Sequence, residues 1–200
     1  MSPWPGTSSL VVPVPALEEW VRRRHHHYDA AYVSFDPSFA HAHITLLSPF
    51  VEPAGLTDEV RRRVAGVLSR HEPFEVRLSH VDVFAGGIIH LVPEDDRPLR
   101  ALTADLVTSF PAYPPYAGRF ADVRPHLTLD MAAGGVDVAS TRRSLGEALP
   151  AHASIGEARL SWYEQHRCRT LEAWPLGAPA TERAAPSRSG IEKPPRQAGS

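Results

Sequence analysis

The feature that most constrains the fold is a four-residue pattern that occurs twice in this 200-residue chain. His43-Ile44-Thr45-Leu46 returns 83 residues later as His126-Leu127-Thr128-Leu129. Side chains alternate faces along an extended strand, so each copy would present its histidine and threonine on one face and its aliphatic residues on the other. A single copy arises easily by chance, and the pair gains meaning only if the surrounding sequence repeats as well.

The surrounding sequence does repeat at nearly the same offset. Arg77-Leu78-Ser79 aligns with Arg159-Leu160-Ser161, and Pro15-Ala16-Leu17 falls on Pro98-Leu99-Arg100. A near-constant offset at separate landmarks indicates a duplicated unit, and two copies are too few for a solenoid. We therefore expect two similar lobes related by a pseudo-twofold axis, with the two His-x-Thr strands facing each other over a central cleft.

The apolar pattern predicts the order strand, helix, strand, helix, strand, run through twice. Helices are expected to open at Pro15, at Thr57 or Asp58, at Pro98 and at Ser140. Strands are expected at residues 9–14, 28–35, 41–47, 76–84, 88–92, 124–129, 155–165 and 169–174. This order predicts an α+β fold that is bilobal, with antiparallel sheets facing the cleft and helices on the outside.

The chain divides into a folded part and a tail. Residues 1–177 are expected to form a single bilobal domain, whereas residues 178–200 combine proline with small polar residues and predict a disordered tail. No apolar run approaches the roughly 18 residues that a membrane helix needs, and the first residues lack the basic-then-apolar order of a secretory signal. We therefore expect a cytoplasmic monomer with no membrane partner.

Composition excludes several kinds of chemistry. A net charge of −2 argues against extensive non-specific binding to nucleic acid. Cys168 is the only cysteine, which excludes a disulfide within the chain and a cysteine-based zinc site. Lys193 is the only lysine and lies in the tail, so lysine adenylation, Schiff bases and a P-loop are also excluded.

The repeated histidines suit displacement at phosphorus. One group must take a proton from the nucleophile while another delivers one to the leaving oxygen, and imidazole, with an unperturbed pKa of about 6.5, can hold either state. The hydroxyls of Thr45 and Thr128 can donate hydrogen bonds to the phosphoryl oxygens and stabilise the charge that builds there. This arrangement requires neither a metal nor a cofactor.

These residues resemble the motifs of a known family. The segment from His43 to Phe50 and the segment from Arg124 to Leu129 are similar to the two motifs of the two-histidine phosphoesterase superfamily, which includes 2′-5′ RNA ligase-like proteins and cyclic phosphodiesterases. The resemblance extends over roughly residues 9–176. It implies a bilobal fold with a catalytic pair, His43 and His126, across the cleft. It also implies metal-free catalysis on nucleotides or RNA ends that carry a 2′,3′-cyclic phosphate or a 2′-5′ linkage, with reverse 2′-5′ ligation as an additional activity.

Other residues near the motifs leave alternatives open. Arg124 lies two residues before His126 and can bind phosphate through both guanidinium nitrogens, although a salt bridge at the rim is an equally simple role. His41 lies at the equivalent position before His43. The two threonines have a second interpretation as strand formers. The remaining strand histidines are assigned no role, namely His80, His90 and His166.

Three functions compete at this point. The leading one is a metal-independent phosphodiesterase, with Thr45, Thr128 and Arg124 binding the substrate. The second is a non-catalytic module on the same fold that binds a nucleotide or RNA end, and the presence of threonine in both motifs counts against it. The third is a metal-dependent hydrolase using some of the eleven histidines, but no His-x-x-x-His spacing beside an acidic residue supports it. The natural substrate and the identity of the base stay open.

Overall fold

A computed structural model of the chain describes residues 6–120 and 122–177, so the predicted tail at 178–200 lies outside the described residues. Strands and helices are interspersed along the chain, with short 3-10 turns between some of them, and the described part ends in three consecutive strands. The strands and α-helices are β1 (Thr7–Pro13), α1 (Glu18–Tyr28), β2 (His43–Leu47), α2 (Asp58–Leu68), β3 (Phe74–Val83), β4 (Ile88–Pro93), α3 (Arg97–Ser109), β5 (Leu127–Met131), α4 (Val138–Leu145), β6 (Ala151–Ile155), β7 (Glu157–Tyr163) and β8 (Arg169–Pro175). The 3-10 turns are η1 (Pro15–Leu17), η2 (Ala30–Tyr32), η3 (Pro53–Gly55), η4 (Pro115–Gly118) and η5 (Gly146–Ala148). The predicted α+β class is confirmed.

The sheet order reflects the duplication. All eight strands form one antiparallel sheet in the order β6-β3-β4-β5-β2-β1-β7-β8. The two His-x-Thr strands, β2 and β5, are neighbours at its middle, and the strands with the repeated Arg-Leu-Ser, β3 and β7, lie at matching places on either side. The pseudo-twofold axis therefore passes between β2 and β5. The structure differs from the expectation in that one continuous sheet joins the two halves, because Ile44 pairs directly with Leu127.

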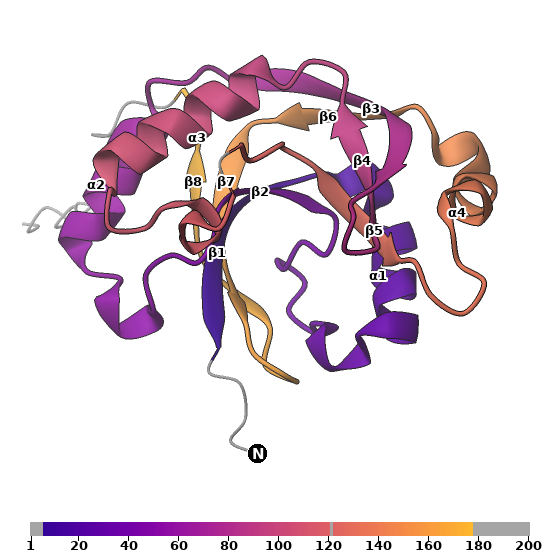
Figure 1. The fold of residues 1–200 in the computed structure, drawn as a ribbon. Coiled ribbons are helices and arrows are strands. Elements are labelled where there is room, and N and C mark those ends of the chain that lie inside the picture. The colour runs from indigo at the N-terminus through magenta and orange to yellow at the C-terminus, as the bar shows by residue number, and fades with distance from the viewer. Residues whose placement is uncertain (1–5, 121, 178–200) are drawn as a thin grey trace, which may run out of the picture.

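The helices lie on the outer side of this curled sheet (Figure 1), with α2 and α3 over one half and α1 and α4 over the other. The halves also exchange helices, since α3 packs against β2 and α1 packs against β5. Each His-x-Thr strand is thus held by a helix from the opposite half of the duplication.

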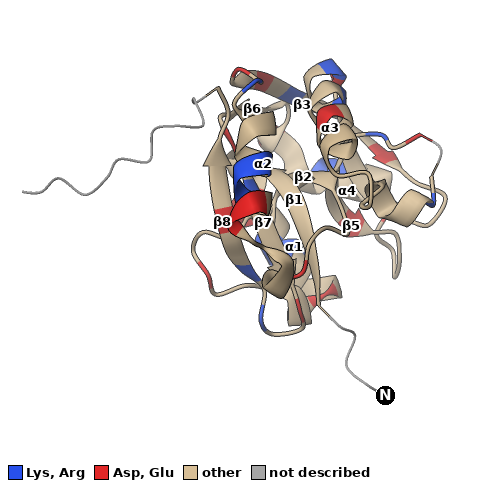
Figure 2. Cartoon of the chain, turned by 90° about the vertical axis from the view of Figure 1, so that its left-hand side faces the viewer, with Lys and Arg blue, Asp and Glu red and all other residues tan. Residues whose placement is uncertain are grey.

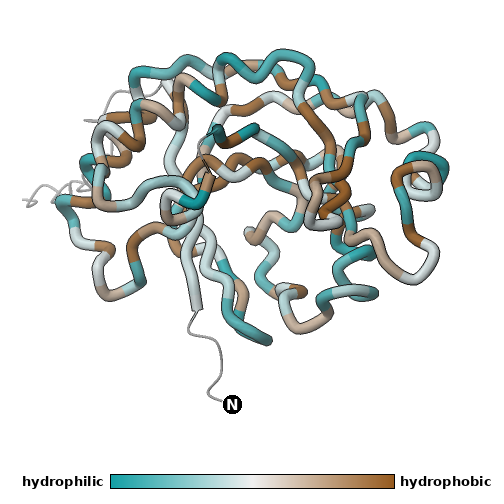
Figure 3. The backbone as a smooth tube through the Cα atoms, in the orientation of Figure 1, coloured by the Kyte–Doolittle hydropathy of each residue, from teal (hydrophilic) through white to brown (hydrophobic). Residues whose placement is uncertain are grey.

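Aliphatic residues of the repeated motif form the centre of the hydrophobic core. Ile44 and Leu46 on β2, with Leu127 and Leu129 on β5, are all at most 2% exposed. They belong to one hydrophobic core with buried helix residues such as Val64 of α2 and Leu102 of α3, so they lie on the helix-covered face. Strands and helices both carry hydrophobic segments along the tube in Figure 3. Because side chains alternate along a strand, the histidines and threonines of both motifs emerge on the opposite face.

The surface carries charges of both signs. Figure 2 shows acidic residues at the start of α2 and basic residues along its exposed side. Acidic residues in the first turn favour a helix because they lie near the positive end of its dipole. The Thr57 hydroxyl also caps α2 by accepting a hydrogen bond from the Val60 N–H. Within residues 6–120 and 122–177, no helix is long and apolar enough to cross a membrane.

One predicted strand is wrong. Residues 28–35 form the end of α1, the turn η2 and an irregular stretch. The N–H groups of Asp29, Tyr32 and Val33 donate to carbonyls three or four residues earlier, which uses them in local turns. Aromatic and β-branched residues favour strands where the surface is half-buried, but Phe35 is 97% exposed. Strand β6 (Ala151–Ile155) was also not predicted, since the next strand after the helix that opens at Ser140 was expected to start at residue 155.

Candidate active site

The pairing of the two central strands brings both motifs together. Ile44 of β2 pairs with Leu127 of β5, and each is the middle residue of its His-x-Thr motif. Extending this antiparallel register by one residue in each direction places His43 opposite Thr128 and Thr45 opposite His126. Directly opposed Cβ atoms in such pairs lie about 4.5–5.5 Å apart, and diagonal pairs about 7–8 Å apart. The two imidazoles and the two hydroxyls therefore lie on one face. The imidazoles occupy diagonal positions, and their separation suits groups on either side of a phosphate.

His43 is anchored at the start of β2 as a neutral acceptor. Its Nδ1 lies 2.9 Å from the Ala40 carbonyl, which can only accept, so Nδ1 carries the proton and Nε2 carries the lone pair. The Tyr163 hydroxyl donates to that Nε2 at 3.2 Å. Burial disfavours the charged imidazolium and lowers the pKa of His43 to about 4. His43 is therefore neutral at pH 7, with its free nitrogen aimed at a donor.

His126 is held in the same tautomer immediately before β5. Its Nδ1 donates to the Arg124 carbonyl at 2.8 Å, which leaves Nε2 available. The ring packs edge-on against Phe84 and His90, with centroid distances of 4.9 and 5.4 Å. Burial is again the main reason that the pKa of His126 is lowered, although its hydrogen bond to the Arg124 carbonyl opposes the shift.

Both threonines are partly buried beside the histidines. The Thr45 side chain is hydrogen-bonded to the phenol of Tyr116, a residue of η4. Tyr116 and Ala117 have φ angles of 51° and 55°, a left-handed conformation that costs energy for residues other than glycine. In the other half, Thr128 pairs with His90 of β4. The two threonines thus occupy equivalent positions with different neighbours.

The two residues that precede the motif histidines by two positions have different environments. His41 is buried, donates from Nδ1 to Glu18 at 2.6 Å and accepts from the Ser34 N–H at Nε2. Both of its nitrogens are therefore used inside the protein. Arg124 is exposed, and its charge is among the causes that lower the pKa values of His90 and His126, after burial. The predicted phosphate contact of Arg124 stays a prediction.

No candidate metal centre is found in the described part of the chain, where no group of three or more His, Cys, Asp or Glu side chains could hold an ion. In His43 and His126, Nδ1 is hydrogen-bonded to a backbone carbonyl, which leaves Nε2 for other partners. The two threonines add hydroxyl groups to the site. This donor set suits proton transfer and hydrogen bonding to oxyanions.

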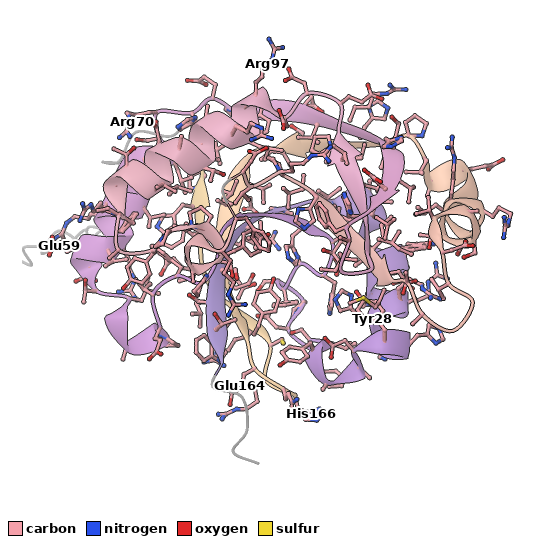
Figure 4. All side chains as sticks on the ribbon, in the orientation of Figure 1. Tyr28, Glu59, Arg70, Arg97, Glu164 and His166 are labelled. Atoms are coloured by element: carbon pink, nitrogen blue, oxygen red, sulfur yellow. The ribbon has the colours of Figure 1, made fainter. Side chains whose placement is uncertain are left out.

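Sequence reasoning gave no role to Tyr163 and His90, which contact the motifs, and it considered Tyr116 only for stacking on a base or packing in the core. Tyr163 and Tyr116 reach His43 and Thr45 from distant parts of the chain, and His90 contacts His126 although it was assigned no role. None of them has a motif of its own, and only the pairing of β7 with β1 or of β4 with β5 brings Tyr163 or His90 close. His166 lies in the turn between β7 and β8, and Figure 4 shows it at the outer edge of the molecule.

Comparison with known proteins agrees with this geometry. The model of the 2′-5′ RNA ligase superfamily matches residues 12–167, which includes both His-x-Thr motifs. No curated protein matches the chain in sequence.

Solved structures share the fold at low sequence identity. The protein TT0787 of Thermus thermophilus superposes with a TM-score of 0.55 at 18% identity, covering 86% of this chain and 98% of its own. E. coli LigT in complex with 3′-AMP gives a TM-score of 0.50 at 19% identity, covering 88% of this chain and all of its own. A structure described as a phosphoesterase gives 0.51 at 19% identity, covering 87% of this chain and all of its own.

Proposed function

Because the chain belongs to the 2′-5′ RNA ligase superfamily, we propose that it is a metal-independent phosphodiesterase that opens 2′,3′-cyclic phosphates or cleaves 2′-5′ linkages at nucleotide or RNA ends. The observation that carries this proposal is the register of β2 and β5, which sets two imidazoles and two hydroxyls on one face. Two proton-transfer groups beside two hydrogen-bond donors are what in-line displacement at phosphorus requires.

The environments of the two histidines support different roles for them in this proposal. His43 is the base, because its lone pair is on Nε2 and its pKa of about 4 keeps it unprotonated through the working range. In the free protein Tyr163 donates to this nitrogen, so the attacking water takes the position of the Tyr163 hydroxyl when substrate binds. His126 is the acid, and its Nε2 delivers the proton to the leaving oxygen.

The reaction balances without another reagent. Water forms the new P–O bond while His43 Nε2 takes its proton, and the bond from phosphorus to the ribose 2′ oxygen breaks as His126 protonates that oxygen. The proton gained by His43 and the one lost by His126 are exchanged with solvent. Thr45 and Thr128 donate to the non-bridging oxygens, where negative charge increases in the transition state.

Nucleotide complexes of a relative agree with the proposed substrate class. E. coli LigT has been crystallised with 3′-AMP and with NADP+. A nucleoside 3′-monophosphate is the product that remains when a 2′,3′-cyclic phosphate opens at the 2′ oxygen. We therefore propose that a nucleotide or RNA end occupies the face between the two motifs in this chain.

The direct test is turnover in EDTA. The purified protein is incubated with 2′,3′-cyclic mononucleotides, ADP-ribose cyclic phosphate and 2′-5′ dinucleotides, and products are separated by chromatography. We expect hydrolysis of at least one class in EDTA at the rate found without it. The double variant of His43→Ala and His126→Ala is the blank for contaminating phosphodiesterases. Activity that is lost on chelation and restored by a divalent ion would contradict the proposal, and binding without turnover would favour the non-catalytic module.

The lowered pKa values predict an acidic optimum. Since kcat/KM reports the free protein, its acid limb should follow protonation of His43 near pH 4. Its alkaline limb should follow loss of the proton from His126, whose pKa lies below the usual 6.5. We therefore expect kcat/KM to peak between about pH 4 and 6.5 and to fall toward pH 8. A plateau that extends through pH 8 would show that His126 is not the acid of the free protein.

A further inference from the structure

One carboxylate holds the stretch of chain that leads into β2. Glu18, at the start of α1, accepts hydrogen bonds from the Ala42 N–H at 2.9 Å, from the His41 N–H at 3.2 Å and from His41 Nδ1 at 2.6 Å. Burial raises the pKa of Glu18, but these hydrogen bonds outweigh burial and lower the pKa below its ordinary value. Glu18 is therefore ionised at neutral pH, and an ionised acceptor makes stronger hydrogen bonds than a neutral one.

One of these bonds reaches the peptide group that orients His43. The His41 N–H belongs to the same peptide as the Ala40 carbonyl, and that carbonyl accepts from His43 Nδ1 at 2.9 Å. Because a peptide group is planar, a bond that fixes its N–H also fixes the direction of its carbonyl. A carboxylate on the N–H polarises the peptide and strengthens the carbonyl as an acceptor. Glu18 therefore acts on His43 Nδ1 through a single peptide group.

The surroundings of His41 require a carboxylate at position 18. The Ser34 N–H donates to His41 Nε2 at 3.0 Å, so the proton of this ring is on Nδ1 and needs an acceptor. The three groups that these bonds join to Glu18 are thus all donors. A carboxylate offers only acceptors, whereas a glutamine amide has one oxygen and would turn its NH2 group toward one of the donors.

Helix α1 also fixes Glu18 relative to the second motif. Further along the helix, Arg24 pairs at 2.5 Å with Asp130, a buried residue of β5. The direct pairing of β2 with β5 is short, since among the described residues it consists of one residue pair, whereas every other strand pairing has four to six. Because α1 packs against β5 (Figure 1) and holds the chain before β2 through Glu18, it braces this junction.

We propose that Glu18 is a positioning residue for His43, holding through the Ala40–His41 peptide the tautomer that leaves the Nε2 lone pair for the attacking water. This inference rests on the proposed function, in which His43 is the base. A carboxylate in a Ser-His-Asp triad likewise fixes the tautomer of its histidine and stabilises the imidazolium that forms. Here a peptide group stands between carboxylate and imidazole. Burial lowers the pKa of His43 most, whereas the charge of Glu18 raises it, which is the direction that favours proton uptake by a base.

Glu18→Gln tests the inference, because glutamine has nearly the same size and lacks one acceptor. We expect kcat for a 2′,3′-cyclic phosphate to fall roughly ten- to a hundredfold, since a displaced base loses its alignment with the attacking water. KM should change little, because Glu18 acts behind the imidazole and not on the substrate. The matched control is Glu19→Gln on the same helix, whose carboxylate pairs with the exposed Arg22 and Arg23. It removes the same charge and should leave kcat unchanged.

The tautomer of His43 gives a readout that does not depend on turnover. Nitrogen-15 NMR of the imidazole at pH 7 distinguishes a proton on Nδ1 from one on Nε2. We expect the Nδ1–H form in the wild-type protein and in Glu19→Gln, and a mixture of both forms in Glu18→Gln. An unchanged tautomer in Glu18→Gln would overturn the proposal even if kcat fell, since a loss of stability alone predicts that result.

The tautomer measurement also separates this inference from the proposed function. If the wild-type protein turns over no substrate, the proposed function fails while the tautomer still decides the role of Glu18. If Glu18→Gln does not fold, Glu18→Asp replaces it, because aspartate keeps the charge but is one methylene too short to reach all three donors. We expect the same mixture of tautomers in Glu18→Asp, and a wild-type tautomer there would overturn the proposal.

Discussion

Replacing His43 or His126 by alanine is expected to lower kcat for a 2′,3′-cyclic phosphate by about 10²–10⁴ in each case, because each ring transfers one of the two protons. The double variant should be little slower than either single variant, since the two groups act as a unit and losing one already disables the concerted transfer. Steady-state kinetics at pH 5 measure the three variants against the unchanged protein.

The control for this experiment is His152→Ala, a loss of imidazole at an exposed position of β6. Thermal unfolding of each variant separates catalytic loss from loss of structure, because His43 also bonds to Ala40 and Tyr163 inside the fold. More than half of the original activity in a folded single variant would remove that histidine from the mechanism.

The duplicated pattern allowed the centre of the fold to be predicted from sequence. Alternation along an extended strand predicts that Ile44 and Leu127 are buried while His43 and Thr128 lie on the other face, and the burial of these residues agrees. These predictions succeed because they depend only on the local geometry of a strand.

The continuity of the sheet could not be predicted in this way. Which strand pairs with which depends on contacts between residues far apart in the chain, such as Ile44 with Leu127. The repeat indicated that the two motifs are related by symmetry, but symmetry is equally satisfied by two separate sheets across a cleft. The hydrogen bonds between β2 and β5 decide between these arrangements.

The less symmetric parts of the candidate site were also beyond the sequence. Tyr163 lies 120 residues from His43 and has no motif, so only the pairing of β7 with β1 brings its hydroxyl to Nε2. His90 was assigned no role because it lies outside both motifs, and its counterpart in the other half of the sheet is Val11. A repeat shows what the two halves share, whereas the assignment of base and acid depends on where they differ.

Thr45→Val and Thr128→Val are expected to weaken transition-state binding by roughly 2–4 kcal/mol each, because valine keeps the shape and strand preference of threonine and removes the donor. The register of β2 and β5 places Thr45 opposite His126 and Thr128 opposite His43, so each hydroxyl lies beside the histidine of the other motif. The pH dependence of kcat/KM should keep its shape, since neither threonine titrates. Thr→Ser should restore much of the rate by returning the hydroxyl.

The control for the threonine variants is Thr108→Val on α3, where the hydroxyl bonds to the Ala104 carbonyl on the exposed side of the helix. It should leave kcat/KM unchanged. The two threonines need not contribute equally, because Thr45 is also bonded to Tyr116 and must release that partner to serve the phosphoryl oxygen. We therefore expect Thr128→Val to cause the larger loss. If valine is tolerated at both positions, the threonines only form the strands, and Arg124, exposed beside His126, becomes the candidate for binding the phosphate.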